Sequence, residues 1–149
     1  GYNYRMSDIH GALGISQLKK LRLFIKERNK IANLYFKILK DLPLYLPKKI
    51  YKNTSSYHLF IIRLKSYNEK IYKKIFNYIR SKKIFINLHY LPVNQQPFYK
   101  KYSKKADNLA NAEIYSNSAF SIPIYNGLSI SEIYYVKKVL KKAIQKFSK

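Results

Sequence analysis

The stretch YHLFIIRL, residues 57–64, predicts a buried strand, and the fold follows from what surrounds it. Most of its residues are apolar or aromatic, and Ile61 and Ile62 are β-branched, a shape that favours extended backbone. A polar loop over residues 52–56 precedes it, and a polar segment that can start a helix follows it. A short apolar stretch between two such boundaries is typical of one strand in a small sheet.

On the N-terminal side, a long helical pattern leads up to this strand. Apolar residues recur at helical spacing from Ile9 to Ile38, and Ser7 is a good N-cap for a helix. We expect one long helix, or two helices joined near Lys20–Leu21, ending at Asp41. An extended linker between two prolines, residues 43–47, then reaches the loop before the strand.

Two glycines, Gly11 and Gly14, lie inside the first part of this helix. Glycine in a helix interior costs about 1 kcal/mol relative to alanine. The whole chain has only four glycines, and two of them lie three residues apart in this helix. We favour close packing of this helix, or the close approach of a ligand or partner, over neutral drift.

On the C-terminal side, helical and extended patterns alternate to the end of the chain. Ser66 with Glu69, and Ser129 with Glu132, have the spacing of capping boxes. The expected elements are a helix to about Lys82, a strand over Ile84–Tyr90, a turn or short helix over Pro97–Tyr102, a helix over Ala106–Ser116, a strand over Ala119–Ile124 and a helix running to Phe147. We therefore predict an α+β fold, with a short sheet of about three strands, helices packed on it and a long N-terminal helix. Residues 1–42 would form a linking helix region and residues 43–149 an α+β sandwich.

The net charge of +23 suggests a polyanionic partner, but the kind of basic residue argues against a specific one. Only five residues are Arg and 25 are Lys, mostly in Lys-Lys pairs spread along the chain. Sequence-specific DNA recognition relies on Arg, which binds guanine through two hydrogen bonds. Lys, Ile, Asn and Tyr make up 72 of the 149 residues and all have AT-rich codons, so biased base composition explains the charge. We expect no specific nucleic-acid partner, and keep a non-catalytic basic module for nucleic acid or acidic polymer as an alternative.

The residues of several common sites are missing. The chain has no Cys, and its three His do not have metal-ligand spacing, so we expect no metal site. Its seven acidic residues form no close pair for acid–base chemistry, and no Gly-rich phosphate loop occurs. No apolar run approaches the ~20 residues of a membrane span, so we expect no membrane segment and a cytoplasmic protein. From its residues alone, the chain predicts an α+β domain rather than a free-standing enzyme.

Two local clusters could carry function. Tyr2, Asn3, Tyr4 and Arg5 precede the predicted helix start, where an amide, a guanidinium and backbone N–H groups could bind an anion. The alternative is a surface turn with stacked tyrosines. The second cluster, residues 87–102, follows a strand with polar and aromatic side chains that suit a sugar or nucleotide. Its alternative is a rigid loop that packs its own aromatic rings.

Both clusters occur in a larger pattern. The blocks GYNYRMSDIHGALGISQLKKL, HLFIIRL, INLHYLPV, PFY and NAEIYSNSAFSIPIYNGLSISEIYYV lie in order from Gly1 to near Val139. Together they resemble the C-terminal part of the DegT/DnrJ/StrS family of sugar-nucleotide aminotransferases. The closest branch is that of the pseudaminic acid pathway, which aminates a UDP-linked 4-keto-6-deoxy sugar.

The resemblance implies the small C-terminal domain of a homodimeric fold-type I enzyme that depends on pyridoxal 5′-phosphate (PLP). Glutamate would donate the amino group, and a UDP- or dTDP-linked keto sugar would accept it, in the synthesis of cell-surface glycans. Asn3 matches the family asparagine that reaches the PLP phosphate of the other subunit, with Arg5 beside it. His89 and Tyr90 match a pair near the sugar nucleotide, and Tyr99 would line the same pocket. His10 departs from the family pattern and receives no role.

The resemblance also implies an absence. The Schiff-base lysine of the family lies in a large N-terminal domain, upstream of the position that matches Gly1, so we assign no catalytic residue to this chain. On its own the chain is expected to be inactive. Some family members carry His in place of that lysine and act as sugar dehydratases, so a PLP-dependent dehydratase remains an alternative.

Overall fold

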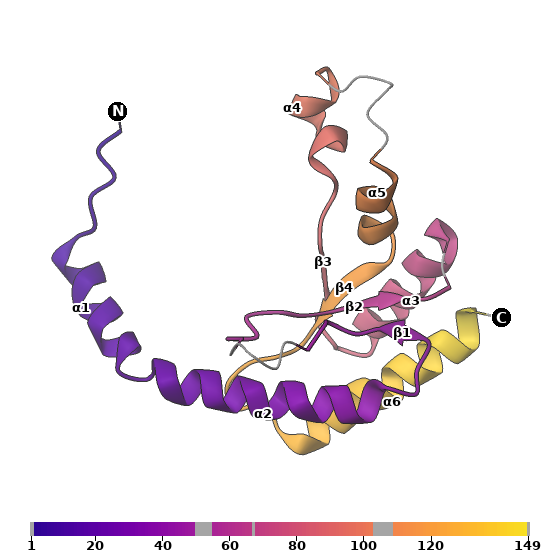
Figure 1. Cartoon of the computed structure of the whole chain (residues 1–149), viewed down its shortest axis with the longest axis horizontal. Helices are drawn as coiled ribbons and strands as arrows, with labels where there is room; N and C mark the ends of the chain where they lie inside the picture. Colours follow the sequence, from indigo (N-terminus) through magenta and orange to yellow (C-terminus); the bar gives the residue numbers. More distant parts are fainter. Residues whose placement is uncertain (1, 50–54, 67, 103–108, 149) are drawn as a thin grey trace.

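The computed structural model describes residues 2–49, 55–66, 68–102 and 109–148. The chain forms an α+β fold in which a small antiparallel sheet is packed against helices (Figure 1). The elements are α1 (Asp8–Leu18), α2 (Leu21–Leu39), β1 (Leu44–Tyr45), β2 (Phe60–Leu64), α3 (Glu69–Ser81), β3 (Asn87–Leu88), the 3-10 turn η1 (Val93–Gln95), α4 (Pro97–Lys100), α5 (Ala110–Ser116), β4 (Ala119–Ile122) and α6 (Ile130–Phe147). The α+β prediction is confirmed.

The sheet has four strands in the order β1-β2-β4-β3, each antiparallel to its neighbours. In β2, Phe60, Ile62 and Leu64 are buried, while Ile61 and Arg63 between them are partly exposed. This alternation is expected for a strand with one face on the core. The two-residue strand β1 was predicted only as part of a linker, and it pairs with the far end of β2.

The core lies between this sheet and the helices α2, α3 and α6. Tyr35 of α2 and Tyr72 of α3 are buried but keep their hydroxyls bonded, because each donates to a backbone carbonyl near β4. The Tyr35 hydroxyl lies 2.8 Å from the Pro123 oxygen, and the Tyr72 hydroxyl 2.7 Å from the Ala119 oxygen. These bonds connect two helices to the central strand pair at both ends of β4.

The long N-terminal helical pattern is two helices, which was one of the two predicted alternatives. Only the second half of α2 reaches the core, whereas no residue of α1 is buried. Figure 1 shows α1 and the residues before it extending away from the sheet. Among the described residues, nothing lies within 4 Å of a Cβ placed on Gly11 or Gly14, so neither glycine is closely packed against that part of the chain.

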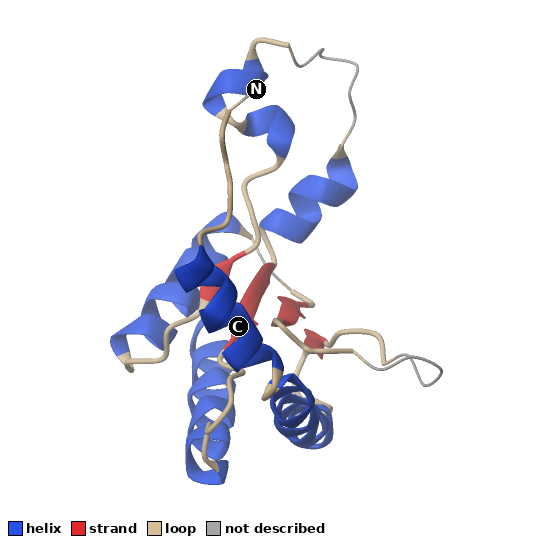
Figure 2. Cartoon of the chain, turned by 90° about the vertical axis from the view of Figure 1, so that its left-hand side faces the viewer, coloured by secondary structure: helices blue, strands red, loops and turns tan. Residues whose placement is uncertain are grey.

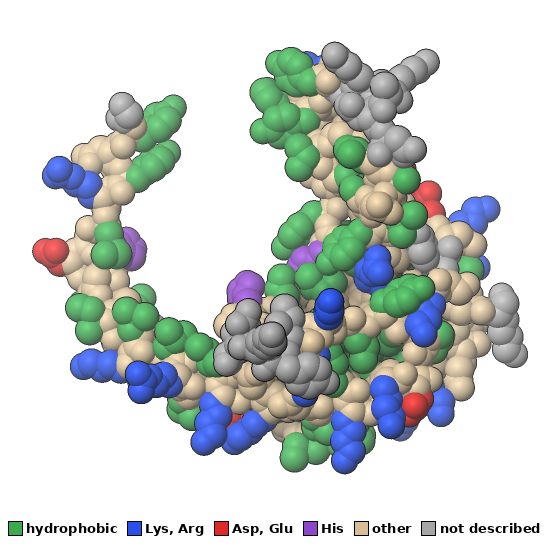
Figure 3. Space-filling view, viewed as in Figure 1, with side chains coloured by type: hydrophobic (Ala, Val, Ile, Leu, Met, Phe, Trp, Pro, Cys, Tyr) green, Lys and Arg blue, Asp and Glu red, His purple; other side chains and the backbone are tan. Residues whose placement is uncertain are grey.

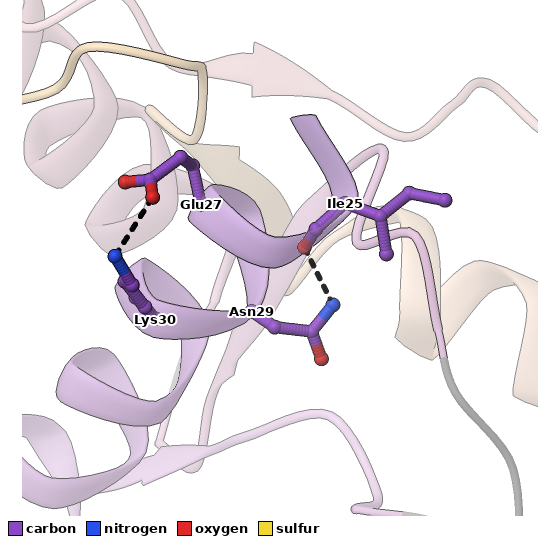
Figure 4. A network of polar contacts seen from close by, with 4 residues as sticks. All are labelled: Ile25, Glu27, Asn29 and Lys30. Atoms are coloured by element: carbon purple, nitrogen blue, oxygen red, sulfur yellow. Dashed lines mark hydrogen bonds and ion pairs between the residues drawn. The ribbon is translucent and has the colours of Figure 1, made fainter. Parts of the chain in front are cut away.

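Polar side chains attach α2 to the start of β2. Asn29 donates both to the Ile25 carbonyl of its own helix and to the Ser55 carbonyl, at 2.8 Å each. Figure 4 shows the first of these bonds beside the exposed Glu27–Lys30 ion pair. Arg28 directly precedes Asn29 in α2. Its Nη1 donates to the carbonyls of Tyr57, His58 and Ile124, at 3.0, 3.0 and 3.1 Å.

Three predicted boundaries are wrong. The strand begins at Phe60 and not at Tyr57, because Tyr57 has φ +41°, which is not strand backbone. The cap of α3 is Asn68, whose side chain accepts from the Ile71 N–H, and not Ser66. The strand predicted over residues 84–90 pairs with β4 only at 87–88.

The predictions near the C-terminus are closer. The capping box of Ser129 and Glu132 at α6 is confirmed. The helix predicted over 106–116 is α5, from Ala110, and its first predicted residues fall outside the described part of the chain, as does most of the loop at 52–56.

Candidate functional site

Asn3 and Arg5 lie on the exposed arm before α1. The rings of Tyr2 and Tyr4 stack with their centroids 5.5 Å apart, as one alternative for this cluster supposed. Both Asn3 and Arg5 are exposed, and neither has a hydrogen-bond partner among the described residues. An amide and a guanidinium held away from the domain core can bind an anionic group supplied from outside this chain.

The arm is attached to a capped helix. Ser7 is the N-cap of α1, and its hydroxyl accepts from the His10 N–H at 3.4 Å and lies 2.8 Å from His10 Nδ1. The structure therefore places His10, which had no predicted role, in the first turn of the helix that follows the arm with Asn3 and Arg5.

His89 and Tyr90 directly follow β3, and the structure brings their side chains together. Their rings meet edge to face, with centroids 4.7 Å apart. His89 is 5% exposed, and burial lowers its pKa, because desolvation disfavours the charged imidazolium. Its Nε2 is buried without a hydrogen-bond partner among the described residues. A neutral imidazole with an unpartnered nitrogen is suited to one hydrogen bond with a polar ligand.

Tyr90 and Tyr99 have different surroundings. Tyr90 is 69% exposed and lines a pocket of about 310 Å³ together with Tyr72 and Phe76 of α3. Tyr99 lies on α4, half exposed, with its ring against Phe98 at 5.1 Å between centroids. Neither Tyr99 nor His89 is among the residues that line this pocket.

Hydrogen bonds within the loop after Tyr90 and from this loop to α5 hold part of it in place. Gln95 donates to Glu113 at 3.1 Å, and Gln96 donates to the Leu91 carbonyl at 3.2 Å. Asn94 differs, because its Oδ1 is buried without a partner among the described residues. The Phe98 ring packs against those of Tyr99 and Tyr102, as the rigid-loop alternative supposed. Asn94 joins His89 as a second buried polar group with unmet hydrogen-bonding capacity among the described residues. No sequence signal distinguishes Asn94 from its polar neighbours.

The two clusters lie on separate projections of the molecule. In Figure 1 the arm before α1 rises at one end of the molecule, and η1, α4 and α5 rise from the sheet at the other. Figure 2, seen from the side of the arm, shows both rising in the same direction from the sheet. Hydrophobic side chains gather on both projections, and Lys and Arg side chains gather along the outer edge of α2 (Figure 3). The cofactor residues and the substrate residues predicted from the sequence are therefore not neighbours within one copy of this chain.

The described residues form neither a metal-ligand cluster nor a membrane-spanning helix. No group of three or more His, Cys, Asp or Glu side chains is placed to hold a metal ion. None of the described helices is both long and apolar enough to cross a membrane.

This α+β fold, with its small antiparallel sheet, is that of the small domain of fold-type I PLP enzymes. The family model of the DegT/DnrJ/EryC1/StrS aminotransferases matches residues 1–141, and the chain belongs to this family.

Named relatives match over the whole chain. It is 36% identical to the UDP-4-amino-4,6-dideoxy-N-acetyl-beta-L-altrosamine transaminase of Campylobacter jejuni, over all of this chain and 40% of that protein. The Helicobacter pylori structure of PseC, an aminotransferase of pseudaminic acid biosynthesis, superposes with a TM-score of 0.87 at 28% identity, covering 99% of this chain and 40% of that one. The chain thus spans about two fifths of the length of these relatives.

A relative with different chemistry also matches. The Escherichia coli GDP-4-keto-6-deoxy-D-mannose-3-dehydratase, whose structure holds hydrated PLP, superposes with a TM-score of 0.75 at 30% identity. The match covers 94% of this chain and 36% of the dehydratase. The fold of this domain is therefore shared by proteins named for two different reactions.

Proposed function

We propose that this chain is the C-terminal part of a PLP-dependent aminotransferase that transfers an amino group to the keto sugar of a nucleotide sugar in glycan biosynthesis. The donor is glutamate, the acceptor is a UDP- or dTDP-linked sugar, and the enzyme works as a homodimer in the cytoplasm. The observation that carries the proposal is the 36% identity with the Campylobacter jejuni transaminase along the entire chain.

The exposed arm fits a cofactor that carries a phosphate. Asn3 offers an amide N–H donor and Arg5 a positive guanidinium, and neither is bonded within the described part of the chain. These two side chains would bind the PLP phosphate, which the resemblance places in the partner subunit. When bound, PLP supplies the electron sink for amino-group transfer, and the protein supplies orientation and electrostatics.

His89, Tyr90 and Tyr99 would bind the nucleotide sugar. A neutral His89 can exchange one hydrogen bond with a sugar hydroxyl through Nε2, and the exposed Tyr90 ring offers a flat face beside it. Tyr99 reaches this ligand only if the sugar nucleotide spans the distance from the end of β3 to α4.

The test of the activity uses the full-length protein that contains this chain. It is incubated with glutamate and a UDP-linked 4-keto-6-deoxy sugar, and the amino sugar and 2-oxoglutarate are measured by mass spectrometry. The proposal expects equal amounts of both products. Absence of both with UDP- and dTDP-linked acceptors would contradict it.

The test of the cofactor residues is Asn3→Ala in the same full-length protein. Loss of one hydrogen bond to a charged phosphate costs roughly 1.5–3 kcal/mol, which corresponds to a PLP dissociation constant about 10- to 150-fold higher. Asn33→Ala is the matched control, because Asn33 is exposed on α2 and remote from the arm. Unchanged PLP affinity in Asn3→Ala would remove the assigned role of this residue.

A sugar dehydratase is the second candidate, and the match with the Escherichia coli dehydratase favours it. The two candidates differ in the product, since a dehydratase removes a hydroxyl from the sugar and leaves no nitrogen on it. The mass of the sugar product in the assay above therefore decides between them.

A further inference from the structure

A second cavity lies at the opposite end of the sheet from His89. It has a volume of about 540 Å³ and opens between the end of α3 and the start of α6. Its lining includes Ile84 and Phe85, which precede β3, and Tyr125, which follows β4, whereas His89 and Tyr90 follow β3. A cavity of this size can hold a small molecule.

The walls of this cavity are largely apolar and aromatic. Leu128 and Val136 are buried and form part of its floor. Tyr125 and Tyr135 are each about half exposed, and Phe85 is 72% exposed, so three rings present surface at the cavity. Exposed aromatic faces of this kind stack on planar ring systems, including nucleobases.

The charge at the rim is positive. Lys82 and Lys83 both line the cavity, and Glu132 is the one acidic residue among its lining residues. The Glu132 carboxylate is bound to the Ser129 N–H at 2.8 Å and to the Ser129 hydroxyl at 2.6 Å, where it completes the cap of α6. The Lys82 ammonium lies over the ring of Tyr78, 5.6 Å from its centroid. Lys83 has no carboxylate within ion-pair distance among the described residues, so its charge is available to an anion.

Lys83 stands where the backbone favours glycine. It follows the C-cap of α3 with φ +59°, its N–H donates to the Arg80 carbonyl at 2.9 Å, and the next N–H donates to the Ile79 carbonyl at 3.4 Å. This is the hydrogen-bond pattern of a Schellman motif, in which the left-handed residue is usually Gly. The chain therefore carries a long cationic side chain at a position where a side chain is conformationally unfavourable.

We propose that this cavity binds a nucleotide, with the base against the rings of Tyr125 and Tyr135 and the phosphate at Lys83. The volume, the aromatic walls and the single uncommitted cation at the rim together match a planar ring that carries a phosphate. The site is separate from the residues assigned to PLP and to the sugar nucleotide, and it does not depend on the proposed aminotransferase activity.

The decisive variant is Lys83→Gly. It removes the ammonium and also relieves the left-handed backbone, so the protein is expected to fold with a higher midpoint of thermal unfolding. Loss of ligand in this variant is therefore not a consequence of misfolding. Lys138→Ala is the matched control, because Lys138 is an exposed lysine of α6 that does not line the cavity. Tyr125→Ala tests the stacking wall separately.

The measurement is isothermal titration of UMP and of AMP into the full-length protein, with uridine and inorganic phosphate as partial ligands. We expect a binding event, in addition to any at the sugar-nucleotide site, that weakens at least tenfold in Lys83→Gly and in Tyr125→Ala and is unchanged in Lys138→Ala. The proposal is overturned if no nucleotide binding responds to Lys83→Gly. It is also overturned if uridine or phosphate alone binds as tightly as UMP, because the site would then recognise only one half of a nucleotide.

Discussion

Replacing Arg28 tests the packing of α2 on the sheet. Its Nη1 lies within 3.1 Å of three backbone carbonyls that belong to the chain just before β2 and just after β4. One Nη1 has two hydrogens, so these contacts amount to about two full hydrogen bonds with shared geometry. A bond from a charged donor contributes roughly 1.5–3 kcal/mol. Arg28→Ala should therefore lower the free energy of unfolding by about 3–6 kcal/mol.

Part of this loss comes from the carbonyls that remain. Ile124 is buried, and Tyr57 holds a left-handed conformation that is unfavourable for a residue with a side chain. Removing the guanidinium leaves these oxygens unpaired and removes the contact that holds Tyr57 in place. We therefore expect Arg28→Lys to recover only part of the stability, because one ammonium lacks the planar fork of donors.

The assay is urea denaturation followed by circular dichroism, with Arg22→Ala as the control. Arg22 lies in the exposed first turn of α2, and a surface substitution of this kind changes stability by no more than about 0.5 kcal/mol. Amide hydrogen exchange over residues 55–60 should rise in Arg28→Ala and not in the control. If Arg28→Ala and Arg22→Ala are equally stable, the three carbonyl contacts do not hold α2 on the sheet.

Two further predictions concern pH and capping. Burial raises the pKa of Tyr72 to about 12, so the stability that its neutral hydroxyl contributes is complete below pH 10 and is lost as the pH rises toward 12. Tyr72→Phe should therefore flatten this part of an alkaline denaturation profile. An unchanged profile would exclude Tyr72 as the source of the alkaline loss. Ser129→Ala removes the N-cap of α6 and should cost about 1 kcal/mol in urea denaturation. The hydrogen bonds from Ser129 also lower the pKa of Glu132, so the stability that they contribute is complete above pH 4.5 and is lost as the pH falls through the lowered pKa. Ser129→Ala should weaken this loss of stability in acid. If the variant keeps the wild-type acid profile, the pKa of Glu132 does not depend on Ser129.

The local sequence was sufficient to predict an element where the residues within that element indicate its type. The alternation of helix and strand predicted the α+β class, and the capping box at Ser129 predicted the start of α6 because both partners lie three residues apart. The strand β2 was predicted, although three residues too long at its start, because apolar and β-branched residues follow one another there. The buried side chains of β2 and α6 then follow from the period of each element.

Tertiary contacts decided the features that have no local period. The strand β1 is two residues long and exists because Leu44 and Tyr45 pair with Leu64 and Arg63, about twenty residues away. The orphaned nitrogen of His89 was equally hidden, since burial and missing partners are properties of the packed chain.

The residues of the family pattern were predicted from sequence, whereas the cavity at Lys83 was seen only in the tertiary structure. Asn3, Arg5, His89 and Tyr90 were predicted from sequence because the family pattern assigns their roles, but only the structure shows that Asn3 and Arg5 lie exposed before α1 and that His89 is buried directly after β3. The cavity beside Lys83 had no sequence signal at all, because its residues come from the end of α3, the entry to β3 and the start of α6. A glycine at position 83 would have predicted the left-handed residue that ends α3, whereas Lys83 gives no such signal in the sequence.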